Sequence, residues 1–114
     1  MKAEELRLNN LIEVNGNTTC LNTNYDLFVA LVGISRNNEN YQPIVLTKEW
    51  LLTLGFVKNK EYGYFELDRL IVAFHDGVDQ FYLCDIDIFV KIETVHHLQN
   101  LYFAIRNKEL TLKP

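Results

Sequence analysis

The sequence has few of the residues that cross-linked and catalytic sites usually need. Its 114 residues include two cysteines, two prolines, five glycines and a single serine, Ser35. Cys20 and Cys84 are too few for a disulfide framework and lack neighbouring zinc ligands, so we expect two reduced thiols without a function. No glycine-rich phosphate loop is present, and nothing around Ser35 resembles a nucleophile elbow. We therefore expect no catalytic residues, no cofactor and no enzyme activity.

Long apolar runs and an excess of basic residues are also missing. No run approaches the roughly 18–20 apolar residues that span a bilayer, and the opening MKAEELRLNN has no apolar signal region. We therefore expect a cytosolic protein with no membrane partner. The net charge of −4 argues against broad, non-specific nucleic-acid binding, which depends on Lys and Arg neutralising phosphates.

The composition is that of a folded protein, with 48% hydrophobic and 12% aromatic residues. The length fits one domain, residues 1–114. The patterns predict an α+β fold: an antiparallel sheet with a short helix at about 47–54 and a longer C-terminal helix at about 94–106. A small β-barrel at the N-terminal end is an alternative for part of the sheet.

The segment LTKEWLLTLGF has both signals of a short helix. Thr47 can cap the N-terminus, because its hydroxyl can accept a hydrogen bond from a free backbone N–H. Gly55 can adopt the left-handed conformation that stops a helix, which returns Phe56 to Leu51 as in a Schellman motif. The second helix has the same two signals, with Thr94 as the cap and Asn107 as the left-handed stop.

The strands are predicted from β-branched and aromatic runs and from alternation. A two-residue period from Asp85 to Ile92 indicates a half-buried strand, and Asp76-Gly77 is a favoured hairpin turn. The other predicted strands are Leu6–Val14 (as one strand or two short ones), Tyr25–Ser35, Tyr62–Leu67 and Leu70–His75. The Asn-rich segments Asn15–Asn24 and Arg36–Pro43 are predicted to be loops.

The histidines and the acidic residues are the remaining candidates for chemistry. His96 and His97 fall in the first turn of the C-terminal helix, where free N–H groups disfavour positive charge, so we expect neutral imidazoles at pH 7. Adjacent helical residues point about 100° apart, so the pair cannot readily chelate one metal ion, and His75 can join them only through the tertiary fold. Four carboxylates, Asp76, Asp79, Asp85 and Asp87, form either a cation site or a solvated strand face, and we favour the solvated face without a metal.

Two segments resemble a group of small uncharacterised proteins from phages and prophages of Bacteroidetes. The first is PIVLTKEWLLTLGF and the second is VHHLQNLYFAIRNKELTL. The matching residues are Pro43, Ile44, Leu46, Thr47, Glu49 to Leu52, Gly55 and Phe56, and then Val95, His96, Leu98 to Ala104, Glu109, Leu110 and Thr111. The chain departs from the group's pattern at His97 and at Arg106-Asn107. The resemblance implies a phage-related setting, in which small acidic proteins often bind and block host machinery.

The function that we expect is binding of a host or phage protein, such as the inhibition of a CRISPR effector or another host defence system. Aromatic residues are favoured at protein interfaces, and this chain has more of them than its core needs. The predicted partner-binding residues are Tyr62, Tyr64, Phe81, Tyr82, Phe89, His96 and Asn100.

Two alternatives stay open. One is a small nucleic-acid-binding module using basic residues if the fold brings them together: Lys2, Arg7, Arg36, Lys48, Lys58 and Lys60. The other is a structural or assembly protein that self-associates through an aromatic sheet face.

Overall fold

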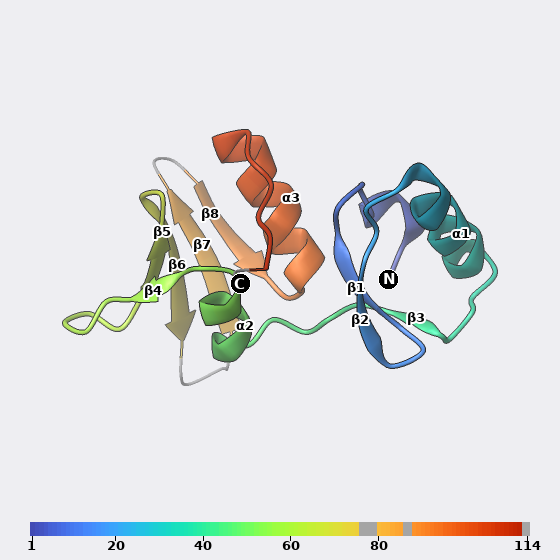
Figure 1. Cartoon of the computed structure of the whole chain (residues 1–114). Helices are drawn as coiled ribbons and strands as arrows, with labels where there is room; N and C mark the ends of the chain where they lie inside the picture. The colour runs from blue at the N-terminus through green and yellow to red at the C-terminus, as the bar shows by residue number, and fades with distance from the viewer. Residues whose placement is uncertain (76–79, 86–87, 113–114) are drawn as a thin grey trace. The chain divides into compact units, whose positions relative to one another are not determined.

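The computed structural model describes residues 1–75, 80–85 and 88–112. The chain forms two compact units, which are described separately (Figure 1). Unit 1 comprises Met1–Val45 and Thr94–Glu109, and unit 2 comprises Leu46–Glu93 and Leu110–Pro114. That the two units fold together as one domain, residues 1–114, stays a prediction.

Unit 1 contains a three-stranded antiparallel sheet and the two longer helices. The sheet has the order β2-β1-β3. Its elements along the chain are η1 (Ala3–Glu5), β1 (Leu11–Val14), β2 (Asn17–Cys20), α1 (Asn24–Ser35), β3 (Tyr41–Gln42) and α3 (Val95–Arg106). The sheet is open, so the N-terminal barrel that we considered is not formed by the described residues.

Helix α1 contradicts the prediction of a strand over Tyr25–Ser35. Thr23 caps the helix, because its Oγ1 accepts a hydrogen bond from the Asp26 N–H at 3.0 Å. Ala30 and Ile34, four residues apart, are the buried residues of α1. The apolar residues of this segment are not confined to one side of the helix, so the sequence shows no helical period that would outweigh its β-branched composition.

The Asn-rich segment Asn15–Asn24 is also not the loop that we predicted. It contains β2, which pairs with β1 so that Val14 lies opposite Asn17. The two residues between them, Asn15 and Gly16, have φ values of 53° and 80°. Positive φ at both positions is the type I′ hairpin geometry that an Asn-Gly pair favours, and this signal was overlooked in the sequence.

Unit 2 is built on a five-stranded antiparallel sheet with the order β4-β5-β6-β7-β8. Its elements are α2 (Lys48–Thr53), β4 (Val57–Lys58), β5 (Phe65–Leu67), β6 (Leu70–His75), β7 (Gln80–Asp85) and β8 (Ile88–Ile92). Strand β6 has the predicted bounds, whereas β5 begins three residues later than predicted. The predicted turn at Asp76-Gly77 lies outside the described residues.

The predicted helix ends are confirmed. Thr47 Oγ1 accepts a hydrogen bond from the Trp50 N–H at 3.2 Å. At the other end Gly55 has a φ of 101°, and the Phe56 N–H donates to the Leu51 carbonyl at 3.0 Å, as a Schellman motif requires. Helix α3 likewise begins after Thr94 and ends at Asn107, whose φ of 56° is left-handed.

Candidate protein-binding surface

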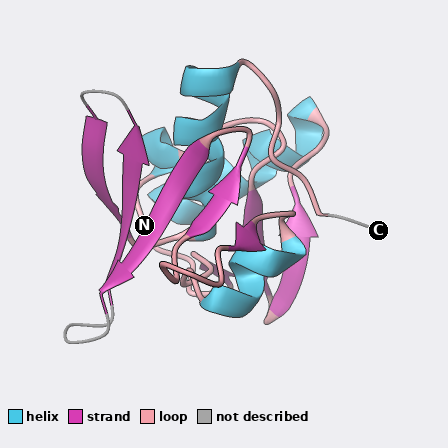
Figure 2. Cartoon of the chain, turned by 90° about the vertical axis from the view of Figure 1, so that its left-hand side faces the viewer, coloured by secondary structure: helices cyan, strands magenta, loops and turns pink. Residues whose placement is uncertain are grey.

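One face of the unit 2 sheet forms the core and the other is open to solvent. On the core face Val72 pairs with Leu83, and Phe81 pairs with Ile92. All four side chains are buried. Because side chains alternate along a strand, the residues between these positions lie on the opposite face. Figure 2 shows the chain turned so that these strands are seen from another side.

The solvent face carries an aromatic pair that the sequence analysis had selected. The Tyr82 and Phe89 rings are stacked, with centroids 4.9 Å apart and planes 10° from parallel. Tyr82 lies opposite Ala73 on one side and Lys91 on the other, which makes Phe89 its diagonal neighbour on β8. Phe89 is 71% exposed. An exposed aromatic side chain held by a stacked neighbour loses little further freedom when it binds a partner.

A shallow cavity lies beside this pair. Its volume is about 380 Å³, and it is lined by Ala73, Phe74, His75, Tyr82 and Phe89. The lining is largely apolar, with the His75 imidazole and the Tyr82 hydroxyl as its polar groups. Such a cavity suits an apolar side chain of a protein partner better than it suits a charged ligand.

A second predicted pair lies in the loop before β5. The Tyr62 and Tyr64 rings are parallel within 5°, with centroids 6.2 Å apart. Asn59 organises this loop, because its Oδ1 accepts hydrogen bonds from the Glu61 and Tyr62 N–H groups at 2.9 and 2.8 Å. Tyr62 is 72% exposed, so the loop presents a further aromatic side chain of unit 2.

Two of the predicted partner-binding residues are not on the surface. Phe81 is 5% exposed, because it points to the core face and packs against Phe74 with ring centroids 4.8 Å apart. His96 is 2% exposed within unit 1. Predicting these two as surface residues was wrong: the strand register buries Phe81, and the apolar stripe of α3 includes His96.

Asn100 is half-buried and belongs to a polar network of unit 1. Its Oδ1 accepts hydrogen bonds from Asn10 Nδ2 at 2.8 Å and Arg7 Nε at 3.2 Å, and its Nδ2 donates to the Glu5 carbonyl at 2.8 Å. Arg7 also forms a two-pronged ion pair with Glu109, at 2.7 and 2.8 Å. The hydrogen bonds from Arg7 hold the pKa of the Glu109 carboxyl below its usual value.

Gln99 is a buried member of the same network, as is Asn10. Its Oε1 accepts a hydrogen bond from the Leu11 N–H at 2.8 Å, and its Nε2 donates to the Asn9 carbonyl at 3.2 Å. One amide side chain of α3 thus holds the backbone where β1 begins. This role could not be predicted from the sequence, because a Gln on a helix does not reveal which distant backbone group it will bind.

His96 lies beside this network, with its Nε2 3.7 Å from a carboxylate oxygen of Glu5. Burial lowers the pKa of His96, and the nearby Glu5 charge opposes that shift without reversing it. The direction agrees with the neutral imidazole that we predicted. His96 Nδ1 is buried and has no hydrogen-bond partner in the described part of the chain.

Among the described residues, the other candidates for chemistry do not form a cluster. Cys20 and Cys84 are free, and burial raises the pKa of both thiols, which makes them less reactive. Asp85 is described, whereas Asp76, Asp79 and Asp87 lie outside the described residues. Within residues 1–75, 80–85 and 88–112, no group of three or more His, Cys, Asp or Glu is placed to hold a metal ion.

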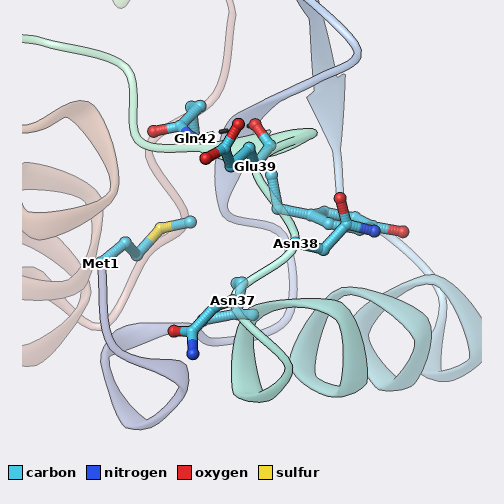
Figure 3. A pocket seen from close by; sticks show the side chains of 7 residues that line it. Met1, Asn37, Asn38, Glu39 and Gln42 are labelled. Atoms are coloured by element: carbon cyan, nitrogen blue, oxygen red, sulfur yellow. Dashed lines mark hydrogen bonds between the residues drawn. The ribbon is translucent and has the colours of Figure 1, made fainter.

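A second cavity, of about 270 Å³, lies in unit 1 between Met1 and the α1–β3 connection (Figure 3). Amide side chains and Glu39 line much of it. These groups partly serve the turn itself: Asn38 Oδ1 accepts a hydrogen bond from the Asn40 N–H at 2.9 Å, and Gln42 Nε2 donates to the Glu39 carbonyl at 2.9 Å. This cavity therefore offers fewer free polar groups to a ligand than its composition suggests.

The basic residues proposed for nucleic-acid binding are divided between the units, with Lys2, Arg7 and Arg36 in unit 1 and Lys48, Lys58 and Lys60 in unit 2. Two of the six already have partners, since Arg7 pairs with Glu109 and Lys48 Nζ lies 4.2 Å from the centroid of the Phe74 ring.

In comparisons with known proteins, no family model, no curated protein and no solved structure matches the chain. No helix in the described part of the chain is both long enough and apolar enough to cross a membrane.

Proposed function

We propose that this protein is a non-catalytic binding module that recognises another protein through the solvent face of its five-stranded sheet. The observation that carries the proposal is the Tyr82–Phe89 stack beside an apolar cavity. Stacked aromatics around a pocket resemble the anchors that contribute most of the energy at protein interfaces. Lys91 lies at the edge of this surface and pairs with Glu93 at 3.2 Å, so a charged pair borders the aromatic residues.

The resemblance to phage proteins supports a narrower form of the proposal. In a phage-related setting the partner is a bacterial protein, and we propose a component of a host defence system, such as a CRISPR effector. The choice of a defence component follows from the phage-related setting that the resemblance implies. The net charge of −4 is consistent with a target whose own nucleic-acid-binding surface is basic.

Nucleic acid is a less favoured ligand for the same face. Proteins that stack bases on aromatic side chains also need cations that follow the phosphate backbone. On the described part of this face the cation beside Tyr82 is Lys91, which is already paired. We expect no mobility shift with single-stranded DNA or RNA at low salt, and a shift that weakens as salt is added would favour the nucleic-acid alternative.

Affinity capture from a Bacteroidetes lysate tests the proposal with two matched variants. Phe89→Ala removes the exposed aromatic of the sheet face, and Phe28→Ala removes a comparably exposed phenylalanine, 63% exposed, in unit 1. We expect a stoichiometric partner that wild type and Phe28→Ala retain and that Phe89→Ala binds at least about tenfold more weakly. Equal recovery by both variants, or no stoichiometric partner, would contradict the proposal.

The narrower proposal has its own experiment. A captured defence nuclease is assayed for target cleavage with wild type and with Phe89→Ala. We expect inhibition by wild type, with a half-inhibiting concentration about tenfold higher for the variant. Binding without inhibition would leave a binding module but exclude a direct inhibitor of that nuclease.

A further inference from the structure

Helix α1 has an apolar side that faces solvent. Tyr25 is 74% exposed, Phe28 63% and Val29 36%, and Val32 is half-buried. These residues recur at i, i+3, i+4 and i+7, so they form one continuous stripe. We call them the outer stripe of α1.

The outer stripe is separate from the side by which α1 joins its own core. Ala30 packs with Ile12 and Leu21 in the core of unit 1, and Leu27 packs against this cluster. At 100° per residue, the centre of the outer stripe lies nearly opposite Ala30. A helix that is apolar on several sides is normally covered on those sides, whereas the described residues cover this one on the side of Ala30.

We propose that two copies of this chain associate through their outer stripes, with the two α1 helices antiparallel about a twofold axis. In such a symmetric pair, a residue that precedes the axis in one copy meets the residue that follows the axis by the same distance in the second copy. With the axis between Phe28 and Val29, Phe28 of one copy faces Val29 of the second copy, and Tyr25 faces Val32. Each large side chain then meets a small one, which is the complementarity that close helix packing needs.

The chemistry of α1 favours this occupant over a lipid surface. A helix that lies on an anionic membrane carries Lys and Arg along the border of its apolar side. Asn24–Ser35 contains no Lys or Arg, and its one charged residue is Asp26. The outer stripe itself has no charged side chain, so two stripes can meet without burying an unpaired charge.

The area of the stripe sets the strength that we expect. An aromatic side chain carries roughly 150–250 Å² of surface, so the exposed parts of the stripe amount to about 300 Å² in each copy. Two copies bury about 600 Å² through these residues, which is less than the roughly 1,200 Å² of a stable interface. We therefore expect a concentration-dependent dimer with a Kd on the order of 10–100 µM.

Sedimentation equilibrium of the full chain from about 5 µM to about 1 mM tests the proposal. We expect wild type to pass from monomer to dimer over this range. Phe28→Glu keeps a good helix former at an exposed position and should weaken the dimer more than tenfold, while Phe89→Ala should leave it unchanged. Circular dichroism confirms that both variants are folded.

Cross-linking tests the antiparallel arrangement, in a Cys20→Ala background to remove the exposed native thiol. Near the axis, two copies of residue 29 are separated by only about 1.5 Å along the helices, whereas two copies of residue 25 are about 10 Å apart. We therefore expect Val29→Cys to form an intermolecular disulfide on oxidation, and Tyr25→Cys to form little.

A chain that stays monomeric at about 1 mM overturns the proposal, as does a dimer that Phe28→Glu leaves intact. Binding of the stripe to anionic vesicles by a chain that stays monomeric would overturn it in favour of a lipid surface. A dimer lost in Phe89→Ala alone would place self-association on the sheet face instead. Because the proposed partner-binding surface is tested by Phe89→Ala and the dimer by Phe28→Glu, each proposal can fail without the other.

Discussion

Replacing Gln99 with leucine should destabilise unit 1 strongly, because the substitution removes a buried hydrogen bond. Gln99 is 1% exposed and Leu11 is 3% exposed, so the hydrogen bond between the Gln99 carbonyl oxygen and the Leu11 N–H is shielded from water. Leucine is similar in size to glutamine and fills most of the same space. The substitution therefore changes mainly the hydrogen bonding and only slightly the packing.

The expected magnitude follows from the groups that lose their partner. A buried N–H without an acceptor costs about 1–3 kcal/mol, and the Leu11 N–H becomes such a group. The Asn9 carbonyl loses the Gln99 donor but keeps a 3.7 Å contact from the Cys20 thiol, so its loss is smaller. We expect Gln99→Leu to lower the free energy of unfolding by about 2–3 kcal/mol, a large part of the roughly 5–15 kcal/mol of a typical domain.

Urea unfolding at pH 7 with linear extrapolation measures the change, and hydrogen exchange at the Leu11 amide locates it. The matched control is Gln42→Leu, because Gln42 is exposed and bonds an exposed carbonyl of its own turn. We expect the control to stay within about 0.5 kcal/mol of wild type. A loss below about 1 kcal/mol with the Leu11 amide still protected would refute the role assigned to Gln99.

Four further results are expected. Thr94→Ala removes the N-cap of α3 and should cost about 1 kcal/mol in urea unfolding. Arg69→Gly should stabilise the protein by about 0.5–1 kcal/mol, because Arg69 occupies a hairpin turn with a φ of 67°. Burial lowers the pKa of His96 in the folded state, so the neutral imidazole stabilises the fold fully above about pH 6.5, and this stability is lost as pH falls below that value. The melting temperature of His96→Leu should therefore fall less than that of wild type as the pH is lowered. Glu109 also has a lowered pKa, so its pairing with Arg7 stabilises the fold above pH 4.5 and is lost as pH falls; Glu109→Gln should reduce the stability difference between pH 7 and pH 3.

Each of these results has an outcome that contradicts its reasoning. Equal stability of wild type and Thr94→Ala would show that the cap bond is replaced by water. A destabilised Arg69→Gly variant would mean that contacts of the arginine side chain outweigh its backbone strain. Unchanged pH dependence in His96→Leu or Glu109→Gln would assign the acid sensitivity to other groups.

The helix ends could be predicted because their signals are local. Thr47 and Thr94 each accept a hydrogen bond from the N–H three residues later, and Gly55 and Asn107 have the positive φ that stops a helix. The two hydrogen bonds each join residues three positions apart, and each positive φ belongs to a single residue. A short stretch of sequence therefore contains the whole signal. The alternation along β8 is equally local: it placed Phe89 and Lys91 on one face, and both are exposed. The same pattern predicted one strand from Asp85 to Ile92, which was wrong, because Asp85 belongs to β7 and pairs with Ile88 of β8.

The polar network of unit 1 could not be predicted, because its partners are far apart in the chain. Arg7 and Glu109 are 102 residues apart, and Gln99 and Leu11 are 88 apart. Nothing within either segment indicates which distant group an amide or guanidinium will bind. The same distance explains Asn100, which we predicted to bind a partner and which instead joins the N-terminal segment to α3 through its hydrogen bonds.

The error at α1 has a different origin, and it bears directly on self-association. A surface helix is recognised by a polar side that repeats every 3.6 residues, and α1 has no such side. Tyr25, Phe28 and Val29 occupy positions that are polar on most helices, and the β-branched and aromatic composition of the segment predicted a strand. The described residues supply cover for α1 on the side of Ala30 and leave Tyr25 and Phe28 exposed. A second copy of α1 would supply the rest, and the missing helical period would then be the sequence signal of an interface between two chains.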